Sequence, residues 1–240
     1  MKYSQLKVFI LMAFFFTSCG GQNKSDLSQE LIRIESKDTV TYSGADEQTS
    51  HTSYEYTDSS GKQVVIYNSY PKGGSRYTDP KGNVYSYAVF WTRIRNETDH
   101  PLEVNIDFPE TSYELSNFPG KYFKILVPSD TMTPDKIPLF NYGLTDIDTF
   151  LDNNTLKRSA VNRTIPSKES GGFYFLMLIL TEHAAGMTRN ELSLKGKDLY
   201  YKISRFSSTK PITLIDEIEI PCGSINLKKL ILRNKKKGHL

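Results

Sequence analysis

The sequence predicts a mainly β protein, an antiparallel β-sandwich that carries one short helix. Short runs rich in β-branched and aromatic residues recur along the chain, and turns containing Gly, Pro and Asn separate them. The longest run, Val84–Asn96, is apolar on both of its alternating faces, as is typical of a strand inside a two-layer structure. The composition, 38% hydrophobic and 24% charged over 240 residues, is that of a globular protein and argues against collagen-like, disulfide-framework and wholly disordered classes.

Eight segments are expected to form strands. They cover residues 63–67, 84–96, 102–108, 122–127, 172–181, 191–194, 199–204 and 212–220. Residues 102–108 alternate strictly between apolar and polar, which predicts a half-buried strand whose even-numbered side chains face inward. Residues 173–180 are continuously apolar, which favours a central strand buried on both faces. The sequence Lys-Gly-Lys-Asp at 195–198 separates two strands and indicates a hairpin loop.

Only residues 144–153 are expected to be helical. Thr145 is a candidate N-cap, and an apolar stripe of Ile147, Phe150 and Leu151 follows it.

Two stretches resemble immunoglobulin-like accessory domains of bacteria. One is the order of strand, turn and strand around residues 95–102, and the other is the segment 165–169 before a strand. The resemblance implies that the expected body of the protein, residues 63–225, is an immunoglobulin-like antiparallel β-sandwich.

The N-terminal segment predicts export. Residues 1–7 contain two lysines, residues 8–16 are uninterruptedly apolar, and the small residues Thr17 and Ser18 precede Cys19. This order describes a secretory signal peptide. Residues 16–19 also resemble the lipobox of bacterial lipoproteins, with Phe16 as in Bacteroidota-like sequences. The resemblance implies cleavage after residue 18 and acylation of Cys19 by palmitate-like chains; the alternative is an ordinary signal peptide with Cys19 there by chance.

The lipobox resemblance also implies a location in the cell envelope. The residue after the cysteine is Gly20 and not Asp, which favours the outer membrane. The anchored protein would face either the periplasm or the outside of the cell. No apolar run reaches the roughly 18 residues of a spanning helix, so the lipid on Cys19 is the expected membrane attachment. Residues 19–62 are polar apart from one small apolar cluster, which predicts a flexible stalk below the folded body.

Residues 226–240 are expected to be a basic tail. They contain six basic residues and no acid: Lys228, Lys229, Arg233, Lys235, Lys236 and Lys237. Two interpretations stand, a final edge strand with a solvated tail, or a patch for anionic partners such as lipid phosphates or acidic glycans. The net charge of the whole chain, +3, gives no reason to expect a nucleic-acid partner.

No catalytic residue, cofactor or metal site is expected. His51 lies in the expected stalk and His239 near the end, and neither His100 nor His183 stands at a metal-ligand spacing. Serine-hydrolase and phosphate-loop motifs are missing, although a pair of glycosidase carboxylates would have no local signature. Cys222 has no histidine close to it in sequence, so we expect a small buried side chain rather than a reactive thiol.

Tyrosine is unusually dense between residues 54 and 87. The candidate ligand or partner surface comprises Tyr67, Tyr70, Tyr77, Tyr85 and Tyr87. Exposed aromatic rings bind sugars and peptides, but tyrosine is also simply a good strand former.

These observations together predict a membrane-anchored, non-enzymatic binding or scaffolding module with an envelope protein as partner. The alternative is a glycan-binding or glycan-hydrolysing surface lipoprotein, and a third possibility is an assembly factor for an outer-membrane machine.

Overall fold

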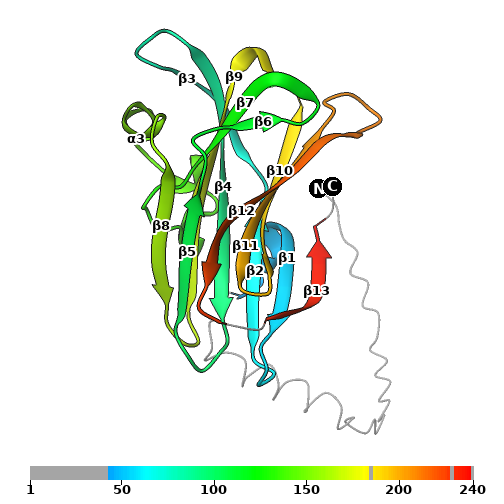
Figure 1. The fold of residues 1–240 in the computed structure, drawn as a ribbon. Helices are drawn as coiled ribbons and strands as arrows, with labels where there is room; N and C mark the ends of the chain where they lie inside the picture. Colours follow the sequence, from blue (N-terminus) through cyan, green and yellow to red (C-terminus); the bar gives the residue numbers. More distant parts are fainter. Residues whose placement is uncertain (1–42, 184–185, 228–229, 239–240) are drawn as a thin grey trace, which may run out of the picture. The chain divides into compact units, whose positions relative to one another are not determined.

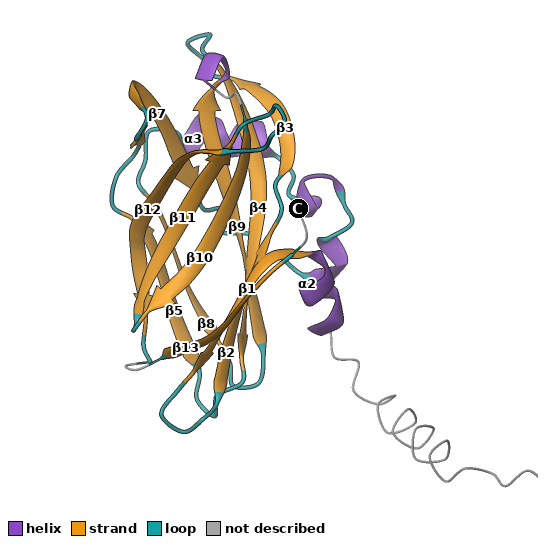
Figure 2. Ribbon diagram, turned by 90° about the vertical axis from the view of Figure 1, so that its right-hand side faces the viewer, coloured by secondary structure: helices purple, strands orange, loops and turns teal. Residues whose placement is uncertain are grey.

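The computed structural model describes residues 43–183, 186–227 and 230–238 as two antiparallel β-sheets (Figures 1 and 2). The larger sheet consists of β1 (Ser50–Thr57), β2 (Gln63–Ser69), β3 (Lys72–Thr78), β4 (Val84–Asn96), β6 (Tyr113–Leu115), β7 (Phe118–Leu126), β9 (Ser170–Leu180) and β13 (Ile231–Lys237). The smaller sheet consists of β5 (Leu102–Phe108), β8 (Ser159–Ile165), β10 (Met187–Lys195), β11 (Asp198–Phe206) and β12 (Leu214–Ile225). The expected signal peptide and Cys19 lie outside the described residues.

The strands are arranged so that each sheet has two edges. The larger sheet has the order β13-β1-β2-β4-β9-β7-β6, and β3 pairs with one end of β4. The smaller sheet has the order β10-β11-β12-β5-β8. The helices are short: α2 (Ser43–Thr49), α3 (Ile147–Asn154) and the 3-10 turns η1 (Pro134–Lys136), η2 (Phe140–Gly143) and η3 (Thr181–His183).

The larger sheet is apolar on both faces because it separates two cores. Phe90 and Ile94 of β4 face the smaller sheet and contribute to the main core between the sheets. Val89 and Trp91, which alternate with them, face a second core covered by side chains from residues 132–151. The two-faced pattern of β4 therefore reflects a sheet covered on both sides, as expected for a buried strand.

Several expectations from the sequence are confirmed. β4 and β5 have the expected bounds, and the even-numbered side chains of β5 are at most 1% exposed. The apolar run at 173–180 lies in β9, between β4 and β7. Lys195 pairs with Asp198 across the predicted hairpin, where Gly196 adopts a φ of +66° that suits glycine.

The helix prediction was wrong in its start and in its cap. α3 begins at Ile147, and Asp146 before it has a left-handed backbone with a φ of 51°. The hydroxyl of Thr145 donates to the Asp146 carboxylate at 3.0 Å instead of accepting a hydrogen bond from the helix backbone. A second helix, α2, was also not expected, so the fold has more than one short helix.

The predicted flexible stalk over residues 19–62 was wrong from residue 43 onward. β1 pairs with β2 on one side and with β13 on the other, and Tyr56 is 1% exposed in the main core. In α2, Asp46 accepts hydrogen bonds from buried Arg93 of β4 at 2.5 and 2.6 Å. The polar composition of this segment is misleading because its polar groups find partners in other strands, which removes the cost of burying them.

The C-terminal segment joins the body as an edge strand. Among the described residues, β13 pairs antiparallel with β1 and has no strand on its other side, so the expected final edge strand is present. Four of the six basic residues lie within this strand and not in a tail beyond it. The expected boundary of the body at residue 225 was therefore too early, because residues 231–237 belong to the larger sheet.

A truncation tests the corrected N-terminal boundary. A chain starting at Gln63 lacks β1, which leaves β13 without a partner and uncovers part of the main core. We expect it to lose at least about 5 kcal/mol of unfolding free energy, the size of a whole domain's stability, whereas a chain starting at Ser43 keeps the stability of the full chain. Urea denaturation followed by far-UV circular dichroism measures this; equal stability of the two truncated chains would contradict the assignment.

Candidate functional site

Side chains of the larger sheet bind the backbone of β10, an edge strand of the smaller sheet. The amide of Asn68 on β2 donates to the carbonyl of Leu192 at 3.1 Å, and the N–H of Leu192 donates back to Asn68 Oδ1 at 2.9 Å. The N–H of Leu194 donates to the hydroxyl of Tyr56 at 2.7 Å. These three hydrogen bonds satisfy backbone groups of β10 that a neighbouring strand would otherwise pair, and they join the two sheets along one side.

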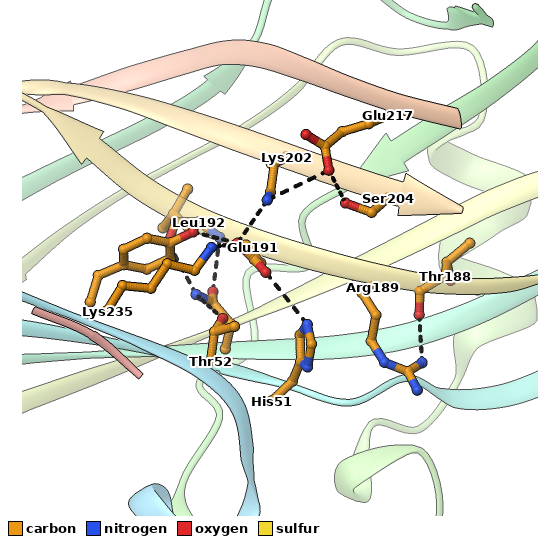
Figure 3. A network of polar contacts seen from close by, with 12 residues as sticks. His51, Thr52, Thr188, Arg189, Glu191, Leu192, Lys202, Ser204, Glu217 and Lys235 are labelled. Carbon is orange, nitrogen blue, oxygen red and sulfur yellow. Dashed lines mark hydrogen bonds and ion pairs between the residues drawn. The ribbon is translucent and has the colours of Figure 1, made fainter. Parts of the chain in front are cut away.

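Glu191, the residue directly before Leu192 on β10, is the centre of a buried polar network (Figure 3). Its side chain is only 4% exposed. The ammonium groups of Lys235 on β13 and Lys202 on β11 lie 2.9 and 3.2 Å from Oε2, and Nε2 of His51 lies 3.4 Å from Oε1. The hydroxyl of Tyr54 also donates to Oε2. Four elements of the chain therefore meet at one carboxylate.

The network holds Glu191 in its ionised form. Burial alone would raise the pKa of Glu191, but hydrogen bonds from His51, Tyr54 and Lys235, together with the charge of Lys202, hold that pKa well below its usual value. Burial, and then the neighbouring carboxylate, raise the pKa of Tyr54, which remains a hydrogen-bond donor. A carboxylate with so low a pKa is a poor proton acceptor near neutral pH, so the arrangement suits structure rather than acid–base chemistry.

A pocket of about 310 Å³ opens where β10 begins, beside the residues at which β3 starts. Its lining comes from the segment 71–74, from 86–88 on β4, from Met177 and Ile179 on β9, from 186–189 at β10 and from Arg205 on β11. The volume is at the lower end of the range of roughly 300–1,000 Å³ found for small-molecule sites. The pocket is thus large enough for a small ligand.

Among the residues whose placement the structure gives, the lining of this pocket contains three cationic side chains and no Asp or Glu. The ammonium of Lys72 donates to the backbone carbonyls of residues 137 and 139 at 2.5 and 2.8 Å. Arg205 is buried and lies 5.1 Å from the centre of the Phe118 ring. Burial lowers the pKa of Arg205, and the carboxylate of Asp216 opposes this shift.

Among the residues that the structure describes, Arg189 at the pocket lacks both an acidic partner and one hydrogen bond. Its Nη1 donates to the carbonyl of Thr188 at 2.9 Å, and its guanidinium lies 5.0 Å from the centre of the Tyr70 ring. Its Nε is buried and has no hydrogen-bond partner. Figure 3 shows Arg189 and Thr188 apart from the contacts around Glu191, although all three residues belong to β10.

The tyrosines expected to form a binding surface do not form one. Tyr67, Tyr77 and Tyr87 are 3, 3 and 8% exposed and belong to the second core, so their positions agree with the role of strand formers. Tyr70 and Tyr85 are half-buried; the first contacts His51 and the second stacks on Tyr77. Of the five, only Tyr87 lines the pocket.

Sequence reasoning missed the residues that the structure brings together. Glu191 and Arg189 are ordinary members of a short strand in the sequence, and no local motif distinguishes them. Cys222, in contrast, is buried as expected, and burial raises the pKa of its thiol. Glu182, the neighbour of His183, is exposed, while the side chain of His183 lies outside the described part of the protein.

Neither a cluster of metal ligands nor a membrane-spanning helix is found in the residues whose placement the structure gives. Among them, no group of three or more His, Cys, Asp or Glu side chains is placed to hold a metal ion. No helix in the same residues has the length and apolar character needed to span a membrane.

The substitution Glu191→Gln tests the buried network. At pH 7 we expect a loss of about 3 kcal/mol of unfolding free energy, because Lys202 and Lys235 lose their buried counter-charge. The pKa of Glu191 is lower in the folded protein than its ordinary value of 4.5, so the ionised side chain contributes stability above about pH 4.5 and this contribution is lost as the pH falls below it. The difference in unfolding free energy between wild type and variant, measured by urea denaturation, should therefore be smaller at pH 3 than at pH 5.

The matched control for this experiment is Glu103→Gln, at an exposed position of β5. It should change the stability by less than about 0.5 kcal/mol at every pH. A loss in Glu191→Gln that is independent of pH would contradict the ionised network.

Comparison of the chain with protein-family models, with curated proteins and with solved structures gives no match.

Proposed function

We propose that the protein is a lipid-anchored, non-enzymatic binding module of a bacterial cell envelope. The observation that carries the binding role is the pocket at the start of β10, which combines apolar walls with cationic side chains and has no acid in its lining. The lipobox-like residues 16–19 support attachment through an acylated Cys19, and Gly20 favours the outer membrane. Several acyl chains on one residue would hold the module at a membrane, since each buried methylene contributes about 0.8 kcal/mol.

Scaffolding is the second part of this proposal, and it is supported by the outer edge of β13, which has no neighbouring strand among the described residues. Ile231 and Leu232 on this strand are 57 and 49% exposed. An exposed edge strand with apolar side chains can accept a strand from another protein, because its outer row of backbone groups is unpaired. An envelope protein that adds a strand here would be the expected partner.

We also propose an immunoglobulin-like arrangement for the sandwich. Two antiparallel sheets that pack face to face around one main core support it. Immunoglobulin domains have roughly seven to nine strands in total, whereas the two sheets of this protein have eight and five. The extra strands and the second core would therefore be additions to the immunoglobulin-like arrangement.

The alternative of a glycan-binding or glycan-hydrolysing surface lipoprotein uses the same pocket. Its cationic lining would suit an acidic sugar. Incubation with envelope polysaccharides separates the two proposals, because only the alternative predicts that the protein binds or hydrolyses a polysaccharide.

The substitution Cys19→Ala tests the lipid anchor. The wild type should fractionate with the outer membrane and incorporate a labelled fatty acid, whereas the variant should be unlabelled and appear in the soluble fraction, because the thiol that accepts the lipid is missing. Cys222→Ala is the control, since this buried thiol should leave labelling and location unchanged. A labelled Cys19→Ala protein in the membrane pellet would contradict the proposed site.

Crosslinking of the full lipidated chain in cells tests the scaffolding role. One envelope protein should be recovered at near-equal amount, and Leu232→Lys should reduce its recovery at least fivefold, because a charge on the edge of β13 opposes strand addition. Leu156→Lys is the control, since Leu156 is 81% exposed and lies beyond α3. Recovery that is the same for both variants, or no recurring partner at all, would exclude β13 as a docking edge.

A further inference from the structure

We infer that the pocket at the start of β10 binds a small amphiphile with one anionic head group, and that Arg189 receives the anion. This inference rests on the proposed binding role and adds the chemical class of the ligand and the residue that selects it.

The walls of the pocket favour an apolar ligand body. Ala88, Met177 and Ile179 line it from two adjacent strands of the larger sheet, and all three belong to or contact the main core. Met187 adds a flexible apolar side chain from β10. A sugar ring in this space would leave most of its hydroxyls without hydrogen-bond partners, which is costly when they are buried. An alkyl chain has no such cost.

The charge of the pocket favours an anion at one end of that body. Lys72 already bonds to two backbone carbonyls, and the carboxylate of Asp216 interacts electrostatically with Arg205 and favours its charged form. Arg189 has no carboxylate within ion-pair distance among the residues that the structure describes, and its buried Nε lacks a hydrogen-bond partner. A carboxylate or phosphate monoester accepts from two N–H groups of one guanidinium, so a ligand head group can supply what Arg189 lacks.

The position of Arg189 is fixed before any ligand arrives. The guanidinium lies against the Tyr70 ring at 5.0 Å and is bonded to the carbonyl of Thr188 at 2.9 Å. Tyr70 in turn contacts His51, which belongs to the network around Glu191. A side chain held in this way loses little conformational freedom on binding, which favours affinity. Arg189 differs from Lys72 in that one of its donors, the buried Nε, lacks a hydrogen-bond partner, and a single anionic group can accept from it.

Calorimetric titration of the full chain carrying Cys19→Ala, which avoids detergent, tests the inference. The probes are hexanoate, octanoate and decanoate below their micellar concentrations, with monooctyl phosphate as a second head group and octan-1-ol as the uncharged control. Octanoate should bind at least tenfold more tightly than octan-1-ol. Affinity should rise by up to about fourfold for each added methylene until the pocket is full. The ratio of the dissociation constants of octanoate and monooctyl phosphate shows which of the two head groups the pocket prefers.

Four variants assign the binding to this pocket. Arg189→Gln should weaken octanoate binding at least tenfold and leave octan-1-ol unchanged, and Arg189→Lys should restore part of the loss. Ala88→Leu should weaken both ligands, because it fills the pocket. Arg233→Gln, at an exposed position of β13, should change neither. Thermal melting of each variant confirms that it is folded.

The inference is overturned if the folded wild type binds none of the probes at millimolar concentration, if octan-1-ol binds as tightly as octanoate, or if Arg189→Gln has no effect. None of these results bears on the membrane fractionation of Cys19→Ala or on recovery of an envelope protein by crosslinking. Failure of this inference is therefore distinguishable from failure of the proposed function.

Discussion

The arrangement of the two sheets depends on the hydrogen bonds that β10 makes as an edge strand. The backbone of Leu192 needs a partner on the side where the smaller sheet ends, and the amide of Asn68 both donates to it and accepts from it. Asn68 Oδ1 also accepts from Thr92 on β4 at 2.8 Å, so one buried side chain joins three strands. An unpaired backbone group in this place would cost about 1–3 kcal/mol, which explains why a polar residue occupies an otherwise apolar interior.

The same strand connects the structural network with the pocket. Residues 191–194 hold β10 against β1, β2 and β13. Residues 187–189, at the beginning of the same strand, line the pocket. Because Glu191 has cationic and hydroxyl partners on three other strands, it orders β13 at the edge of the larger sheet. Arg189, two residues away on the same face of the strand, has no such acidic partner within the described parts of the chain. This contrast between neighbouring charges on one face is what points to a ligand.

The residues around the two cores explain why tyrosine density did not mark a surface. Tyr67, Tyr77 and Tyr87 fill the space between the larger sheet and the segment that contains η2 and α3. The hydroxyl of Tyr77 donates to the exposed Asp152 of α3 at 2.6 Å, so this hydroxyl already has a partner within the protein. A sheet that is covered on both faces needs large aromatic side chains for two cores, whereas a sheet with one face in solvent needs them for one.

The sequence by itself determined the mainly β class, the bounds of β4 and β5, the central place of β9 and the hairpin at residues 195–198, because apolar periodicity and turn residues act over a few positions. Only the tertiary structure decided that β1 belongs to the sheet and that Glu191 and Arg189 have different partners. The contacts responsible join residues far apart in the chain: Asn68 and Leu192 are separated by 124 positions, and Tyr54 and Glu191 by 137. Whether a polar residue is buried depends on such partners, and local sequence carries no information about them.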